Sequence, residues 1–157
     1  MNPKTSDYQK QQRYQENEIL EHAAEILANR YVRGDVFCNP EATKEFARCK
    51  LGGCEQEVFA LMLLDNQHRL IEFKELFRGT IDTASIYPRE VVKTVLEANA
   101  AAIIMTHNHP SGDPTPSQAD RRMTDRLKDA LSLVDVRTLD HIVTGESCFS
   151  FAERGWL

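Results

Sequence analysis

Two histidines, a serine and an aspartate stand at short spacing in the second half of the chain. His107 and His109 are two residues apart, and Ser117 and Asp120 follow after seven residues rich in proline and glycine. The two imidazoles fall on the same side of an extended chain. Two imidazole nitrogens and one carboxylate leave a fourth position for water, as in a catalytic zinc site rather than a structural one. One zinc ion per chain would lower the pKa of that water to about 7, so that hydroxide is available near neutral pH.

Each of these residues also has an ordinary structural explanation. A histidine at the end of a strand is commonly a polar residue satisfied by hydrogen bonds, and Ser117 with Asp120 fits the S-x-x-D pattern of a helix N-cap. The complete spacing, placed between a buried strand and a capped helix, favours a metal site. Ser117 could serve both purposes, because its oxygen can accept a helix N–H while its hydroxyl hydrogen is offered to a substrate oxyanion.

The hydrophobic pattern predicts the elements that must position these residues. Helices are expected over 16–31 with Gly34 as its end, over 40–51 between Asn39 and Gly52-Gly53, from Pro88 onward, and over 118–134. The helix that begins at Pro88 is expected to bury Val91, Val92, Val95 and Leu96. Strands are expected over 58–64, 70–77, 80–87, 100–105, 136–143 and 148–151, with a loop over 106–116 and a frayed segment over 1–13. The order of these elements predicts an α/β (α+β) fold, with one mixed β-sheet flanked by helices.

The spacing H-x-H-x7-S-x-x-D is similar to the signature of the JAMM (MPN-type) metalloproteases, and His-Asn-His-Pro-Ser-Gly resembles the form seen in the bacterial RadC family. Further similarities are Pro-Arg-Glu-Val at 88–91, Gly-Thr at 79–80, Asp-His-Ile at 140–142 and Ser-Phe at 150–151. The resemblance implies a JAMM/MPN fold, which is cytidine-deaminase-like, over 36–157, with 1–35 as an N-terminal helical extension. It further implies His107, His109 and Asp120 as zinc ligands, and Ser117 as the oxyanion-stabilising serine.

The same resemblance implies a catalytic glutamate just before an apolar strand early in the domain. Glu57 directly precedes the apolar run 58–64 and matches the family position, with Glu55 as the fallback. This carboxylate would take a proton from the metal-bound water and later donate it to the leaving amine. A solvated charge at a strand start is the alternative. His141 is equally open: it could support the metal site from behind, or be a strand histidine bonded to a backbone group.

The expected activity is zinc-dependent hydrolysis of peptide or isopeptide bonds, with an unknown peptide or protein as substrate. The alternative is a non-catalytic protein of DNA metabolism that uses the JAMM fold as a binding scaffold. A zinc nucleobase deaminase is disfavoured, because the H-x-E and P-C-x-x-C elements are missing. Longer RadC-like proteins carry a helix-hairpin-helix region, and the first 50 residues lack its pattern; the chain resembles the short form found on prophages.

The composition of the chain limits the number of domains, the partners and the location that we expect. The 157 residues suggest about one domain. Nineteen Lys and Arg against 24 Asp and Glu give a net charge of −5, so no strong nucleic-acid binding is expected. The longest apolar run has seven residues where a membrane span needs roughly 20, so a soluble, cytoplasmic protein without membrane contact is expected. The four cysteines form no C-x-x-C pair and are expected to be free thiols, mostly in the core. The oligomeric state stays open.

Overall fold

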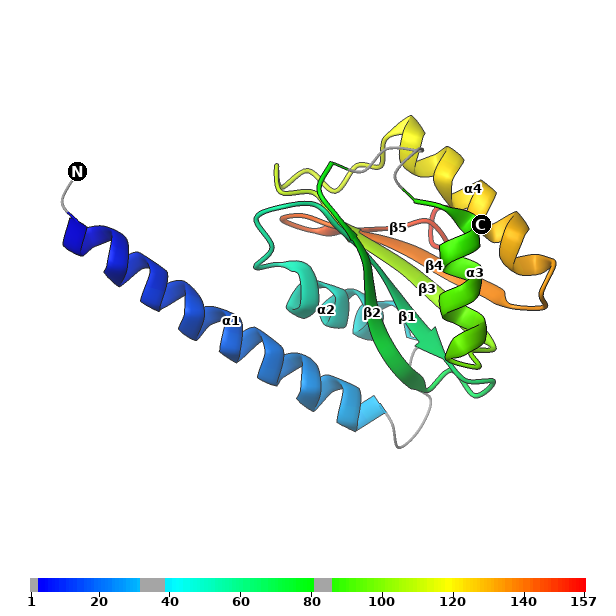
Figure 1. The fold of residues 1–157 in the computed structure, drawn as a ribbon, viewed down its shortest axis with the longest axis horizontal. Coiled ribbons are helices and arrows are strands. Elements are labelled where there is room, and N and C mark those ends of the chain that lie inside the picture. Colours follow the sequence, from blue (N-terminus) through cyan, green and yellow to red (C-terminus); the bar gives the residue numbers. More distant parts are fainter. Residues whose placement is uncertain (1–2, 32–38, 81–85) are drawn as a thin grey trace.

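The computed structural model describes residues 3–31, 39–80 and 86–157, and in that part it has four helices and five strands (Figure 1). In chain order they are α1 Pro3–Tyr31, α2 Pro40–Leu51, β1 Val58–Leu64, β2 Leu70–Arg78, α3 Pro88–Glu97, β3 Ala102–Asn108, α4 Gln118–Ser132, β4 Arg137–Thr144 and β5 Cys148–Ser150. No helix among these residues is both long enough and apolar enough to cross a membrane.

The strands form one mixed sheet in the order β2-β1-β3-β4-β5. Only β3 and β4 run parallel; every other neighbouring pair is antiparallel. Every residue of β1 and β3 is buried. Strands covered on both faces are expected to read as continuous apolar runs, as 58–64 does. The predicted fold class, a mixed sheet flanked by helices, is confirmed.

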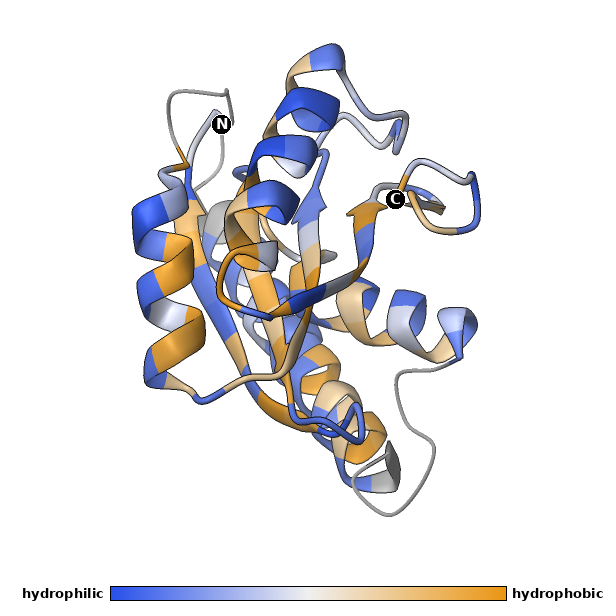
Figure 2. Ribbon diagram, turned by 90° about the vertical axis from the view of Figure 1, so that its right-hand side faces the viewer, coloured by the Kyte–Doolittle hydropathy of each residue, from blue (hydrophilic) through white to orange (hydrophobic). Residues whose placement is uncertain are grey.

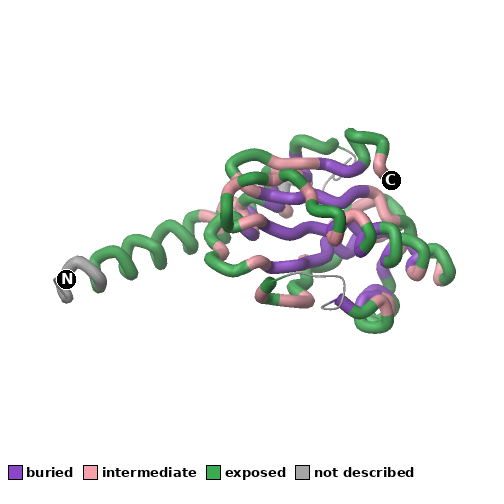
Figure 3. Tube along the Cα trace, turned by 90° about the horizontal axis from the view of Figure 1, so that it is seen from above, coloured by how far each residue is buried: buried purple, intermediate pink, exposed green. Residues whose placement is uncertain are grey.

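Helices cover both faces of the sheet. On one face, α3 and α4 pack against Phe59, Leu61 and Ile103 of the central strands. On the other face, α2 packs through Phe46 and Ala47, and α1 adds Ala24 to the same core. Apolar residues fill the strands in the middle of the molecule, and the buried segments gather there as well (Figures 2 and 3). The site described below lies on the face covered by α4.

The predicted caps of α2 are confirmed. Asn39 stands at the N-cap and its side-chain oxygen accepts a hydrogen bond from the N–H of Glu41 at 3.0 Å. Pro40 occupies the first helical position, where its missing N–H costs no hydrogen bond. Gly52 ends the helix.

Three sequence-based expectations about the helices and loops are wrong. Segment 1–13 was expected to fray, but α1 begins at Pro3, because Gln, Lys, Arg and Glu are good helix formers. Leu96 is 55% exposed, since Val91 and Val95 define the inward face of α3 and Leu96 lies about 100° around from Val95. The loop does not begin at residue 106, because β3 continues through Asn108: it pairs with β1 as far as His107 and with β4 as far as Asn108. Gly34 and residues 81–85 of the expected strand over 80–87 lie outside the described residues.

Candidate metal centre

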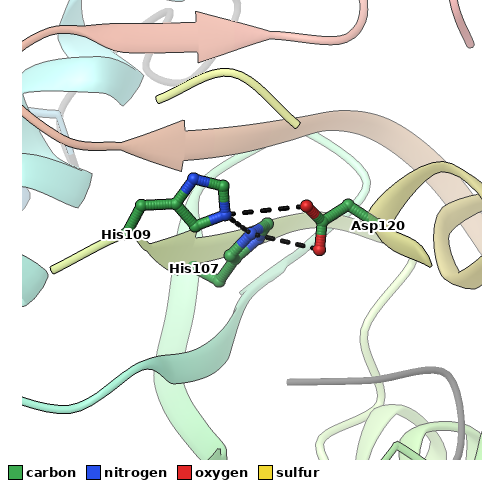
Figure 4. A group of neighbouring side chains, drawn as sticks. All are labelled: His107, His109 and Asp120. Atoms are coloured by element: carbon green, nitrogen blue, oxygen red, sulfur yellow. Dashed lines mark hydrogen bonds and ion pairs between the residues drawn. The ribbon is translucent and has the colours of Figure 1, made fainter. Parts of the chain in front are cut away.

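His107, His109 and Asp120 converge on one point (Figure 4). His107 lies near the end of β3, His109 directly follows that strand, and Asp120 stands in the first turn of α4. The Nε2 atoms of the two histidines are 2.9 Å apart. Asp120 Oδ1 lies 3.4 Å from Nε2 of His107, and Oδ2 lies 3.6 Å from Nε2 of His109. The sheet and the helix thus bring together three groups that the sequence separates by up to 13 positions.

These three groups fit a zinc ion. A tetrahedral zinc with ligand bonds of about 2.0–2.2 Å places neighbouring ligand atoms about 3.4 Å apart, which the 2.9, 3.4 and 3.6 Å separations bracket. The Nδ1 atom of His109 lies 2.8 Å from the carbonyl oxygen of Asp113. A carbonyl only accepts, so that nitrogen carries the hydrogen and Nε2 presents a lone pair. A carboxylate oxygen and the lone pairs of neutral imidazoles that converge in this way could hold a metal ion.

The site is buried on the sheet side and more open at His109. The side chains of His107 and Asp120 are 1% and 4% exposed, whereas that of His109 is 15% exposed. Burial alone would raise the pKa of Asp120, but the adjacent imidazole groups of His107 and His109 outweigh burial and hold that pKa well below the usual range. The adjacent carboxylate of Asp120 likewise raises the pKa of His109 against the opposing effect of burial. The carboxylate is therefore ionised, as a metal ligand must be.

Ser117 caps α4 and bonds to Asp120. Its Oγ accepts the N–H of Asp120 at 3.1 Å, and Asp120 Oδ2 accepts the N–H of Ser117 at 2.6 Å. The predicted S-x-x-D capping box is therefore confirmed. The hydroxyl of Ser117 donates to Asp120 Oδ2 at 2.8 Å. Its role toward a substrate oxyanion stays a prediction.

The two candidate glutamates before β1 differ in their surroundings. Glu57 is half-buried, and its charge contributes to the raised pKa of His109, so its carboxylate acts on the site electrostatically. Glu55 is exposed and pairs with Arg13 of α1. The structure thus separates the two residues by environment. The catalytic role of Glu57 stays a prediction.

Sequence reasoning missed Asn108, which lies between the two histidines. Its side-chain oxygen accepts the N–H of Val58 at 2.7 Å, and its amide donates to the carbonyls of Gln56 at 3.0 Å and Cys54 at 3.3 Å. These bonds bracket Glu57 on both sides. Asn108 thereby ties the segment that carries Glu57 to the strand that carries His107. An asparagine inside a motif gives no sequence signal of a partner 50 residues away.

His141 lies behind His107. This contact distinguishes the two interpretations of His141, which are support of the metal site and a hydrogen bond to a backbone group. Its Nε2 is 2.8 Å from Nδ1 of His107, and its Nδ1 is 2.6 Å from Oγ1 of Thr124. Both ring nitrogens therefore meet side chains rather than a backbone group. Full burial lowers the pKa of His141 well below its usual value, and the proximity of His107 lowers it further.

None of the described cysteine side chains belongs to the group that could hold a metal ion. Among the described residues Cys49, Cys54 and Cys148 are free and half-buried, and Cys49 and Cys148 pack against the core cluster of the α2 face; Cys38 lies outside the described residues. Burial raises the pKa of each of the three thiols. A thiol with a raised pKa is a poor nucleophile near neutral pH.

Comparison with known proteins finds close relatives. A UPF0758 protein of Vibrio cholerae is 81% identical over the whole of both chains. A second UPF0758 protein of the same organism is 69% identical over 93% of this chain and 92% of its own length. A UPF0758 protein of Shewanella baltica is 56% identical over 87% of this chain but only 61% of its own length. A family model described as a RadC-like JAB domain matches residues 37–156. With most of its length matched, from α2 through the three converging side chains to the residues after β5, this chain belongs to the RadC-like JAB domain family.

Proposed function

We propose that this protein is a zinc-dependent hydrolase of peptide or isopeptide bonds. The observation that supports the proposal is the convergence of two imidazoles and one ionised carboxylate beside a half-buried glutamate. His107, His109 and Asp120 would hold the metal. Three protein ligands leave a position open for substrate and water, which distinguishes catalytic from structural zinc sites.

When bound, a zinc ion supplies Lewis acidity and makes a nucleophile available near neutral pH. Glu57 would accept a proton at its carboxylate from water as the water oxygen bonds to the carbonyl carbon, and would donate that proton to the amine nitrogen as the C–N bond breaks. The Ser117 hydroxyl would turn from Asp120 Oδ2, to which it donates a hydrogen bond in this structure, and would donate that hydrogen bond to the developing oxyanion instead. The substrate would be a peptide or protein, and the free thiols suit the reducing cytoplasm as the place of action.

Metal analysis followed by a cleavage screen tests the proposal. Purified protein is expected to hold one zinc per chain by elemental analysis, and the double variant His107→Ala/His109→Ala to hold none. Zinc-loaded protein is then incubated with a peptide library and with isopeptide-linked peptides. Cleavage that stops on chelation and returns with Zn²⁺ would support the proposal. Full zinc content in the double variant would overturn the ligand assignment, and intact substrates throughout would favour a binding scaffold instead.

A further inference from the structure

A chain of three hydrogen bonds runs from the Nδ1 edge of His107 into the molecule. His107 Nδ1 lies 2.8 Å from Nε2 of His141, and Nδ1 of His141 lies 2.6 Å from Oγ1 of Thr124. Thr124 Oγ1 in turn lies 2.7 Å from the carbonyl oxygen of Asp120. All three side chains are at most 1% exposed. The chain thus starts at one candidate ligand and ends at the backbone of another.

The carbonyl of Asp120 at the end of the chain determines which atom is the donor and which is the acceptor in the hydrogen bonds that lead to it. A carbonyl oxygen has no hydrogen, so the hydroxyl of Thr124 must donate to Asp120, as helical threonines commonly do four residues back. The hydroxyl hydrogen is then used, and Oγ1 accepts from His141, whose Nδ1 therefore carries a hydrogen. In the opposite arrangement two oxygens would face each other at 2.7 Å with no hydrogen between them.

The surroundings of His141 favour the neutral ring. Phe151 stacks on it with ring centroids 4.7 Å apart, and Phe59 meets it edge to face at 6.1 Å. An unpaired charge is costly to bury in such an apolar enclosure. The Nε2 of a neutral ring that is protonated at Nδ1 has only a lone pair, and therefore accepts the hydrogen on Nδ1 of His107.

We propose that His141 and Thr124 are positioning residues for metal binding: they hold His107 as its Nδ1–H tautomer, so that its Nε2 lone pair faces His109 and Asp120. His109 is held as the same tautomer by a single hydrogen bond, which its Nδ1–H donates to the carbonyl oxygen of Asp113. Partners that fix the tautomer and ring orientation of a ligand histidine also raise its basicity. The inference rests on the metal site of the proposed function, but not on the bond that the protein cleaves.

The first experiment reads the tautomers directly. Full-length protein with ¹⁵N-labelled histidine is studied by NMR spectra that correlate the ring nitrogens with the hydrogens on the ring carbons. Spectra are recorded for the metal-free protein and again after addition of Zn²⁺. His141 is expected to carry its hydrogen on Nδ1 in both forms, and His107 to carry its own on Nδ1 in the zinc form. A hydrogen on Nε2 of His141 would reverse the chain and overturn the proposal. This measurement on the unaltered protein depends on no variant's folding.

The second experiment measures zinc affinity by competition with a chromophoric chelator. Thr124→Val removes the hydroxyl at nearly constant shape and should weaken Zn²⁺ binding about 10–100-fold. Thr124→Ser keeps the hydroxyl and should restore the affinity. Thr106→Val is the matched control, because the buried hydroxyl of Thr106 has no hydrogen-bond partner among the described residues; its affinity should equal that of the wild type. A folded Thr124→Val protein with wild-type affinity would overturn the proposal.

The two proposals fail in different ways. Zinc binding that weakens in Thr124→Val, without cleavage of any peptide, would contradict the hydrolase and support the positioning role. Peptide cleavage with zinc affinity insensitive to Thr124→Val would support the hydrolase and contradict the positioning role.

Discussion

Asp120 uses its two carboxylate oxygens for different tasks. Oδ1 faces His107, while Oδ2 accepts the N–H and the hydroxyl of Ser117 and also lies near His109. The two readings of S-x-x-D, a helix cap and part of a metal site, are therefore both satisfied by one geometry. This explains why the motif could be located from the sequence: cap, loop and ligands occupy a single short segment whose internal spacing is fixed.

Glu57 is the residue whose function can be separated most cleanly from its structure. Glu57→Gln keeps the shape of the side chain but removes the group that accepts the proton. We expect zinc content to be unchanged and kcat to fall about 10²–10⁴-fold, the usual contribution of general acid–base catalysis. Glu55→Gln is the matched control and should change neither property, because Glu55 is exposed and pairs with Arg13.

Elemental analysis and turnover are measured for both glutamine variants side by side. Loss of zinc in Glu57→Gln would make this residue a ligand or a folding residue. Near-normal turnover of Glu57→Gln would show that another residue acts as the general base.

Ser117 is expected to have both a capping and a catalytic role, and two substitutions can distinguish them. Ser117→Ala should cost about 0.5–2 kcal/mol of stability, because the N-cap acceptor is lost, whereas Ser117→Gly should cost only a few tenths. Both variants lose the hydroxyl, so kcat should fall about 10²–10³-fold in each. Urea unfolding and turnover are the two measurements. A Ser117→Gly protein with normal turnover would leave Ser117 with its capping role alone.

At the scale of elements, strand β3 shows where sequence reasoning reaches its limit. The hydrophobic pattern predicts its apolar part, but places Thr106, His107 and Asn108 in a loop because they are polar. They remain in the strand because β4 pairs with all three and β1 pairs with Thr106 and His107, and because the side chains of Asn108 and His107 find buried partners. Those partners come from distant parts of the chain, which a local pattern of hydrophobicity does not contain.

The link between β3 and the start of β1 predicts that Asn108 acts through Glu57. Asn108→Ala leaves the N–H of Val58 and two carbonyls without their partner, at a cost of about 1–3 kcal/mol of stability. Because a misplacement of about 1 Å can lower a rate about 10²-fold, kcat should fall up to that much. Zinc content should stay at one per chain, since the ligands are untouched. Loss of zinc together with activity would show that Asn108 supports the ligands rather than Glu57.

At the scale of the whole molecule, charge makes DNA an unfavourable partner. With a net charge of −5, we expect duplex DNA to bind no more tightly than about 10⁻⁶ M at physiological salt, and the affinity to fall steeply as salt is raised. Fluorescence anisotropy of a labelled duplex over a salt series measures both. Tighter binding that persists at physiological salt would contradict the expectation and favour a role in DNA metabolism.

Helix α1 divides into two halves with different surroundings. Residues 7–19 are all exposed; the first turns extend away from the rest of the molecule (Figure 3), and Arg13 pairs with Glu55. Further along, Ala24 is fully buried in the core cluster that also holds Phe46 and Ile104, and Lys50 of α2 pairs with Glu21 at 2.6 Å. The domain division at residues 35 and 36 stays a prediction, but the second half of α1 shares the core of the part that follows it.

This packing predicts that the two halves of α1 differ in their effect on stability. Deleting residues 1–12 removes no described buried side chain and should leave the free energy of unfolding unchanged. Ala24→Leu keeps helix propensity but overfills the contact with Phe46, and should cost about 1–3 kcal/mol. Glu25→Leu places the same side chain on an exposed position of the same helix and should stay within about 0.5 kcal/mol. Urea unfolding compares the three. If Ala24→Leu were as stable as Glu25→Leu, α1 would not be held in the core beside α2, and the whole helix would be the independent extension that the sequence suggests.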